Sequence, residues 1–269
     1  MIKCHGAASA STHSRERREG KITMATRDHD KEYQDNSERQ YSYEFDHIVR
    51  DHLLRRLEPS MKRSGETLEL GAYNGDMTEQ LLAYYERMDV VEASAVLADQ
   101  VRDRFGDRVD VTTALFEDFV PEKRYDNIYL VHTLEHLDDP ISELVRIGSW
   151  LADDGLLFIA VPNANALSRQ IAVHMGIVDH NAAITPGEYQ HGHRRTYSLD
   201  TLLADVRRAE LGLVDFGGVI VKPLANYQFD RALADGIVTP EFIQGCDSLS
   251  EIYPDLSSSI FAVCGRASV

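Results

Sequence analysis

Apolar residues recur at mostly three- and four-residue spacing in the stretch that ends near residue 60. They are Phe45, Ile48, Val49, Leu53, Leu54 and Leu57. Such spacing aligns apolar side chains along one face of an α-helix. The pattern therefore predicts a helix with one buried face, inside an N-terminal cap over residues 24–60.

From residue 66 onward, short apolar runs alternate with helical patterns. Strands are predicted over residues 67–71, 88–92, 109–112, 126–131 and 156–161, and helices over residues 76–85, 96–105 and 140–151. Strands that alternate with helices form a parallel sheet with helices on both faces. The fold class that we expect is therefore α/β, with a doubly wound sheet.

The last third of the chain is less regular. A helix is predicted over residues 198–209, and strands over 213–221 and 259–264, which makes a mostly parallel sheet of seven strands. Two connections, 163–197 and 222–258, are longer than a compact α/β unit needs, and long connections often carry lids or pockets. We expect residues 61–269 to form one domain with lid insertions there, the first closing together with the N-terminal cap.

Residues 1–23 differ from the rest of the chain. They contain five Lys or Arg residues and two Glu, and they lack the apolar run of a secretory signal. Glu16 and Glu19 also count against an amphipathic transit peptide. We therefore expect a disordered tail, with Met24 as an alternative start.

The composition narrows the range of partners. The chain has 28 Lys and Arg against 44 Asp and Glu, a net charge of −16. Such a surface repels phosphate backbones and anionic lipids, and no apolar run is long enough to cross a membrane. Cys4, Cys246 and Cys264 form no CxxC pair. We expect a cytoplasmic protein with a small-molecule substrate and neither nucleic-acid nor membrane partners; the oligomeric state stays open.

The loop after the first predicted strand has the position at which doubly wound sheets bind nucleotides. Gly71 allows a ligand close to the backbone, and Gly75 allows the next helix to start tightly against the strand. Glu92 ends the second strand 21 residues after Gly71, the distance at which a carboxylate meets ribose hydroxyls. A nucleotide-containing cofactor is therefore indicated.

The same loop disfavours a dinucleotide. The glycine pattern GxGxxG is not met, because Tyr73 and Asp76 occupy its second and third glycine positions. Glu69 and Asp76 flank the loop, and two carboxylates repel a pyrophosphate. A cofactor that carries an ammonium and a sulfonium would tolerate them.

Four segments, ELGAYNGD, VVEAS, YDNIYLVHTLEHLDDP and GLLFIAVPNAN, follow one another in this order. In order and spacing they resemble the class I S-adenosylmethionine-dependent methyltransferases, over about residues 45–220. The resemblance is closest to the branch of ubiquinone-pathway O-methyltransferases and natural-product (secondary-metabolism) enzymes. It implies a Rossmann-like fold and S-adenosylmethionine as the cofactor.

The resemblance also implies positions for the cofactor. Gly71, Tyr73 and Gly75 would surround its methionine part, and Glu92 would bind the ribose hydroxyls. The adenine would lie beside Leu115 and Phe116, and His132 would face the methionine end. The family usually has glycine where this chain has Tyr73, so the resemblance leaves the reaction type open.

Two histidines follow the fourth predicted strand. His132, Glu135 and His136 match HxxEH, a zinc-peptidase pattern when it lies on a helix, but here the context is a loop. We therefore expect no metal. Glu135 and His136 either fix the loop by hydrogen bonds or lie at the substrate site, where His132 or His136 would act as the general base.

Further polar residues are candidates for contacts with the substrate. Asn163 and Asn165 follow the fifth predicted strand and either orient an acceptor, a catalytic role for Asn163, or close the turn. His193 and Arg194 in the first long connection either lie in a solvated turn or bind an acidic group of the substrate.

Three tyrosines precede the first predicted helix. They are Tyr33, Tyr41 and Tyr43. Each either packs in the core or folds over the ligands, where a tyrosine face attracts a sulfonium as it does an ammonium. We assign Tyr41 to the cofactor and Tyr33 to the substrate.

The leading functional hypothesis is methyl transfer from S-adenosylmethionine to an oxygen or nitrogen of a small molecule. The alternative is a cyclase that closes the aminocarboxypropyl chain to azetidine-2-carboxylate and releases methylthioadenosine, as some relatives of the family do. An NAD-dependent oxidoreductase is a minor alternative, and a cofactor-binding protein without catalysis is a further one.

Overall fold

The computed structural model describes residue 30 and residues 43–267. One sheet of seven strands has the order β3-β2-β1-β4-β5-β7-β6. The strands are β1 (Thr67–Leu70), β2 (Met88–Glu92), β3 (Val109–Thr113), β4 (Tyr125–Val131), β5 (Leu151–Pro162), β6 (Leu211–Val219) and β7 (Ser259–Arg266). Strand β7 runs antiparallel to both β5 and β6, whereas the pairs among β1 to β5 are parallel. The predicted fold class is confirmed.

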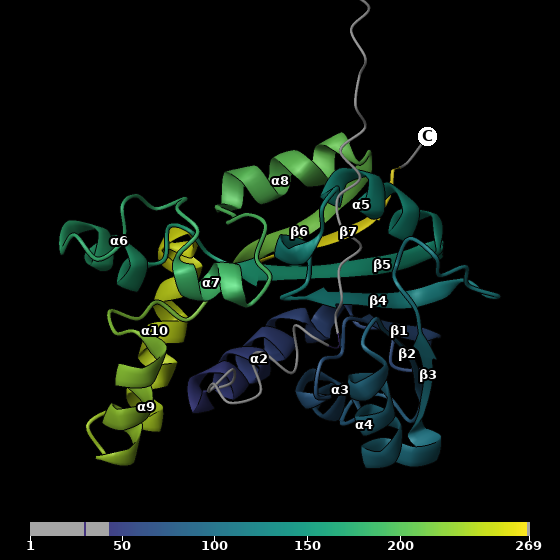
Figure 1. The fold of residues 1–269 in the computed structure, drawn as a ribbon, viewed down its shortest axis with the longest axis horizontal. Helices are drawn as coiled ribbons and strands as arrows, with labels where there is room; N and C mark the ends of the chain where they lie inside the picture. The colour runs from purple at the N-terminus through teal and green to yellow at the C-terminus, as the bar shows by residue number, and fades with distance from the viewer. Residues whose placement is uncertain (1–29, 31–42, 268–269) are drawn as a thin grey trace, which may run out of the picture.

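Helices cover both faces of this sheet (Figure 1). They are α2 (Glu44–Leu57), α3 (Asp76–Leu81), α4 (Ala95–Phe105), α5 (Pro140–Ser149), α6 (Leu167–His174), α7 (Pro186–Gln190), α8 (Leu199–Arg208), α9 (Asn226–Ala234) and α10 (Pro240–Ile252). Short 3-10 helices are η1 (Glu58–Ser60), η2 (Gly106–Arg108), η3 (Leu134–His136) and η4 (Pro254–Leu256). Figure 1 shows α5 and α8 on one face and α2, α3 and α4 on the other.

Alternation along the strands divides the core into two layers. In β4, Ile128 and Leu130 are buried with residues of α5 and α8, whereas Tyr129 between them packs on the side of α2 and α3. In β1, Leu68 and Leu70 belong to the α5 side. This is the period of two that a strand buried on both faces requires.

Helix α2 buries the face that its sequence predicts. Phe45, Val49, Leu53, Leu54 and Leu57 are all buried in the layer that also contains α3 and α9. The described part of the N-terminal segment therefore packs directly on the sheet domain.

The bounds of several elements differ from the sequence prediction. Helix α3 ends at Leu81, and β6 starts at Leu211. Strand β5 begins at Leu151 and contains a bulge where its pairing with β4 shifts register. A Cβ atom at Gly155 would lie 2.4 Å from the Tyr125 carbonyl oxygen, so the close approach of β5 to β4 at this bulge requires a glycine.

Both long connections contain helices. Helices α6 and α7 lie in the 163–197 insertion, and α9 and α10 lie in the 222–258 insertion. They gather beyond the end of β5 where its arrowhead lies, on the left of Figure 1. In this parallel part of the sheet, that end is the carboxyl edge, where ligands bind.

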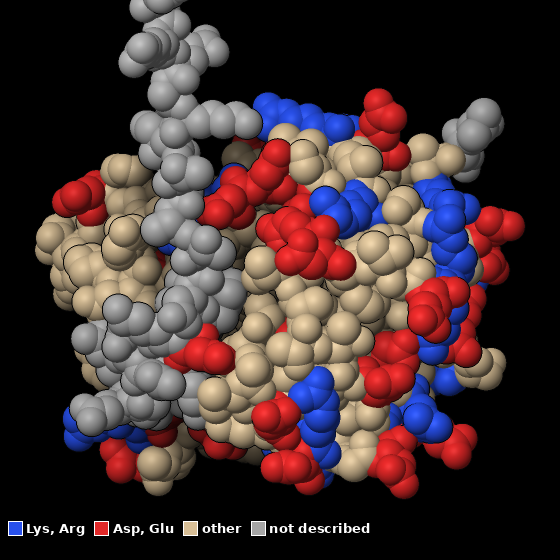
Figure 2. Space-filling model, turned by 45° about the vertical axis from the view of Figure 1, so that its right-hand side comes forward, with Lys and Arg blue, Asp and Glu red and all other residues tan. Residues whose placement is uncertain are grey.

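The surface mixes both signs of charge. Figure 2 shows Lys and Arg side chains among Asp and Glu on one face of the molecule. Ion pairs on the surface of the molecule include Arg104 with Glu79 at 2.5 Å and Lys123 with Glu66 at 2.6 Å. Within the described residues, no helix is both long and apolar enough to span a membrane.

Candidate functional site

The turn between β1 and α3 has an unusual backbone. Gly71, Tyr73 and Gly75 have φ angles of 80°, 49° and 85°. Positive φ is easy for glycine but strained for tyrosine. A Cβ atom at Gly71 would lie 2.8 Å from Thr133 Oγ1, so this glycine also gives room to Thr133 in the loop after β4. The turn therefore presents bare backbone at the edge of the sheet.

Glu92 holds this turn in place. Its carboxylate accepts hydrogen bonds from the backbone N–H groups of Tyr73 and Ser94, both at 2.9 Å. The side chain is only 6% exposed, and burial raises its pKa, an effect that the two N–H donors partly offset. The residue at the end of β2 thus lies beside the glycine turn, as the sequence predicts.

Gly75→Ala should destabilise the protein by about 3 kcal/mol. The new Cβ would lie 2.6 Å from Phe105 Cε2, and alanine would also be strained at a φ of 85°. Gly236→Ala is the matched control, because it has a φ of 68° with nothing within 4 Å, and it should cost only about 1 kcal/mol. Urea unfolding of both variants measures the difference. Equal losses in the free energy of unfolding of the two variants would show that the contact of the new Cβ with Phe105 does not destabilise the protein.

The charges around the turn differ from the sequence-based expectation. Glu69 is buried, accepts a hydrogen bond from Thr78 Oγ1 at 2.6 Å, and has its pKa raised to about 7, chiefly by burial. Asp76 is paired with Arg104 at 3.2 Å and lies 3.6 Å from His47 Nε2. Glu69 is therefore only about half ionised near pH 7, and the charge of Asp76 is paired with Arg104, so repulsion of a pyrophosphate is a weaker argument than the sequence suggested.

Arg50 is a site residue that the sequence analysis missed. It comes from α2, and its charge acts on the pKa values of both Glu69 and His132. Its Nη1 atom is buried and has no hydrogen-bond partner among the described residues. The helical pattern of α2 gave only the apolar face, so nothing in the sequence distinguished this arginine from its exposed neighbours.

His132 stands at the end of β4 with a φ of 52°. Its Nε2 lies 3.1 Å from Ser259 Oγ, and burial, Arg50 and His193 together lower its pKa to about 3. The imidazole is therefore neutral near pH 7. A group with so low a pKa is a weak proton acceptor, which favours His136 among the two predicted bases.

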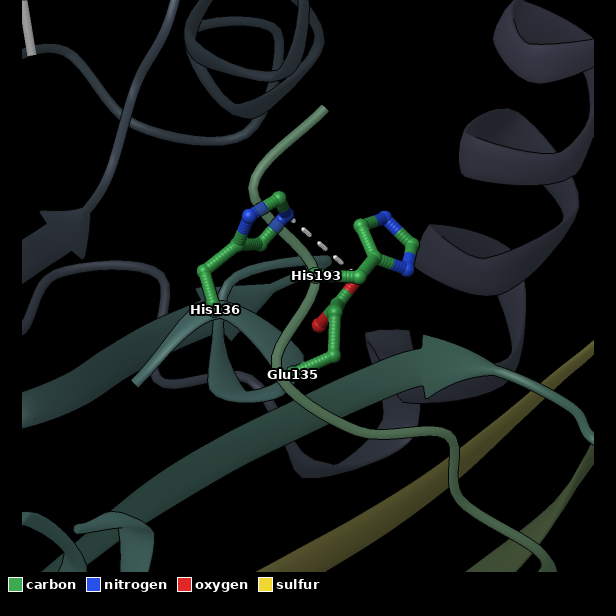
Figure 3. A group of neighbouring side chains, drawn as sticks. All are labelled: Glu135, His136 and His193. Carbon is green, nitrogen blue, oxygen red and sulfur yellow. Dashed lines mark ion pairs between the residues drawn. The ribbon is translucent and has the colours of Figure 1, made fainter. Parts of the chain in front are cut away.

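Glu135, His136 and His193 form a cluster beside this strand end (Figure 3). His136 Nε2 lies 3.9 Å from Glu135 Oε1, and the two imidazole rings are 4.7 Å apart between centroids. Burial raises the pKa of Glu135 to about 8. His193 comes from the 163–197 insertion, so the structure joins residues that the sequence treated as two separate groups.

The other predicted substrate residues are largely engaged with the protein. Asn163 donates both amide hydrogens to the carbonyls of Asp255 and Ser257 at 2.8 Å, and its Oδ1 accepts from the Asn165 N–H at 2.9 Å, which corresponds to the turn-closing alternative. Asn165 Oδ1 accepts a hydrogen bond from Asn181. Arg194 pairs with Asp138 at 3.2 Å. Their roles toward a substrate stay predictions.

The predicted adenine residues follow β3. The Ala114 N–H donates to the Glu92 carbonyl at 3.1 Å, which sets the next two residues, Leu115 and Phe116, beside the end of β2. Phe116 is buried and Leu115 is half-buried. Tyr33 and Tyr41 lie outside the described residues, as does the predicted tail over residues 1–23.

Comparison with known proteins shows the family and the fold of the chain. A family model described as a methyltransferase domain matches residues 33–215. No curated protein matches the chain. Among solved structures, the chain resembles the N-methyltransferase NodS from Bradyrhizobium japonicum WM9 in complex with S-adenosyl-L-homocysteine. The identity is 14%, the match covers 88% of this chain and 99% of that one, and the TM-score is 0.56.

Two other solved structures have the same fold. One is a putative methyltransferase in complex with the Haloferax volcanii Trm112 activator, at 14% identity, covering 91% of this chain and 100% of that one, with a TM-score of 0.55. The other is the [4+2]-cyclase SpnF, at 13% identity, covering 83% and 82%, with a TM-score of 0.55. At such identities these likenesses show the fold alone.

Proposed function

The chain belongs to the family of methyltransferase domains, and S-adenosylmethionine is its cofactor; from this premise we propose that it methylates an oxygen or nitrogen of a small molecule. The observation that carries the proposal is the turn with Gly71 and Gly75, which Glu92 holds by a hydrogen bond at 2.9 Å. This places bare backbone and a carboxylate side by side at the edge of the sheet, where a nucleoside with an amino-acid tail can bind.

Each part of the cofactor has a complementary partner in this proposal. The ribose hydroxyls bind Glu92, and the adenine lies against Leu115 and Phe116. The methionine part extends along the Gly71–Gly75 turn. Its carboxylate binds Arg50, whose buried Nη1 has no hydrogen-bond partner among the described residues.

For methyl transfer, the main contribution of the protein is to align the methyl group with the acceptor. The sulfonium already activates the methyl group, so the enzyme supplies orientation and excludes water. An oxygen or nitrogen acceptor must also lose a proton. His136 lies within 3.9 Å of Glu135 Oε1 and is the base that we propose.

A second candidate function rests on Tyr73. It has a φ of 49° at a position where related enzymes usually have glycine. If its ring folds the methionine chain back, the amine can attack the carbon bound to sulfur and close an azetidine ring. The products are then methylthioadenosine and azetidine-2-carboxylate, with no acceptor needed.

Product analysis tests the proposal. We expect the full chain to convert S-adenosylmethionine to S-adenosylhomocysteine only when a metabolite extract that contains an acceptor is added, as measured by mass spectrometry. Methylthioadenosine above the spontaneous background without an extract would overturn methyl transfer in favour of the cyclase. Tight binding of NADH in place of S-adenosylhomocysteine would contradict both.

A further inference from the structure

The carboxylate of Glu135 is buried in a way that is costly for a charged group. The side chain is 2% exposed, and within residues 43–267 neither of its oxygens has a hydrogen-bond partner. Such burial is strongly unfavourable unless a cation or hydrogen-bond donors compensate for it. A bound cation would provide that compensation.

The arginines near this carboxylate do not hydrogen-bond to it. Arg169 and Arg195 line the same small cavity as Glu135. Arg169 pairs with Glu188 at 2.6 Å, and Arg195 donates to the carbonyls of Leu137 and Asp138. Among the described residues, His136 is paired with this carboxylate, its Nε2 lying 3.9 Å from Glu135 Oε1.

The imidazoles of His136 and His193 come from two segments that are fixed to each other. His136 follows Glu135 in η3, whereas His193 lies in the 163–197 insertion. The backbone N–H of Arg194 donates to the Glu135 carbonyl at 2.9 Å, and that of His193 donates to the Glu188 carbonyl at 3.0 Å. In Figure 3, His136 and His193 flank the Glu135 carboxylate.

We propose that Glu135, His136 and His193 bind one divalent transition-metal ion. One donor atom from each residue lies within 4.8 Å of the other two. Ligands at about 2.1 Å from a tetrahedral metal lie roughly 3.4 Å apart, so small side-chain movements complete the site. Two imidazole nitrogens and a carboxylate oxygen suit Zn²⁺, Co²⁺ or Fe²⁺, whereas Mg²⁺ and Ca²⁺ prefer oxygen ligands.

Three protein ligands leave at least one coordination position open. The cavity lined by Glu135, Asn163 and His193 has a volume of about 10 Å³, roughly the space for one water-sized ligand. If methyl transfer occurs as proposed above, the metal would hold an acceptor oxygen in its open coordination position and lower the pKa of that oxygen. His136 would then act as a ligand and not as the general base, and the preferred substrates would be hydroxyl acceptors.

Metal titration of the full chain tests the site without cofactor or acceptor, so its outcome is independent of whether methyl transfer occurs. After chelator treatment and dialysis, we expect one Zn²⁺ or Co²⁺ per chain by mass spectrometry of the metal content, together with Co²⁺ visible absorption typical of nitrogen ligands. Glu135→Gln and His193→Ala should each weaken binding at least about a hundredfold. His180→Ala changes an exposed histidine of the same insertion and should bind metal like the wild type.

Specific outcomes would overturn the site. They are substoichiometric uptake of Zn²⁺ and Co²⁺ by the wild type, equal binding by Glu135→Gln, or tighter binding of Mg²⁺ than of Zn²⁺. Glu135→Gln keeps the shape of the side chain and replaces a carboxyl group that burial already holds largely protonated near pH 7, so it should fold. Unchanged binding of S-adenosylhomocysteine by this variant confirms that any loss of metal is local.

Discussion

Glu92→Ala should weaken the binding of S-adenosylhomocysteine by about a hundredfold. In the proposed complex the carboxylate binds two ribose hydroxyls, and it also anchors the turn through the Tyr73 N–H at 2.9 Å. Each hydrogen bond to a charged group contributes about 1.5–3 kcal/mol, and every ~1.4 kcal/mol changes affinity tenfold. Titration calorimetry with S-adenosylhomocysteine measures the loss.

Two further variants make this result specific. Glu92→Gln keeps an acceptor oxygen of similar shape and should lose about tenfold in affinity. Asp205→Ala removes a different buried carboxylate, which accepts a hydrogen bond from Tyr197 on the side of α8. It should lower stability but leave the affinity unchanged. Wild-type affinity in Glu92→Ala would remove Glu92 from the cofactor site.

Arg50→Met should weaken the binding of S-adenosylhomocysteine by about tenfold to a hundredfold. The affinity for methylthioadenosine should stay that of the wild type. Methylthioadenosine lacks the amino-acid carboxylate that binds Arg50 in the proposed complex, so its affinity should not depend on this contact. The expected range corresponds to one charge-assisted hydrogen bond of about 1.5–3 kcal/mol. Competition binding with the two ligands measures both affinities.

Arg55→Met is the control for this variant. Arg55 lies on the same helix, is 60% exposed, and pairs with Asp51 at 2.7 Å. A pair so exposed contributes little, so neither ligand should bind differently. An equal loss of both ligands in Arg50→Met would show that Arg50 supports the structure of the site and does not bind the carboxylate.

The sequence by itself determined the framework of this protein. The spacing of Phe45, Val49 and Leu53 gave the buried face of α2, and the alternation of apolar runs gave a mostly parallel sheet of seven strands. The positions of the glycine turn after the first strand and of Glu92 at the end of the second strand were also predicted from the sequence. These features are readable because helix and strand periods are local, and because parallel strands bring the turns after them to one edge.

Only the tertiary structure decided the chemical state of the site. Burial raises the pKa of Glu69 to about 7 even though the hydrogen bond from Thr78 lowers it, so this carboxyl group carries only part of the charge that the sequence assigns to it. Folding also places Arg50 of α2 toward the site and His193 beside Glu135. The direction and burial of such side chains depend on packing between segments far apart in the chain, and a local pattern carries no record of that packing.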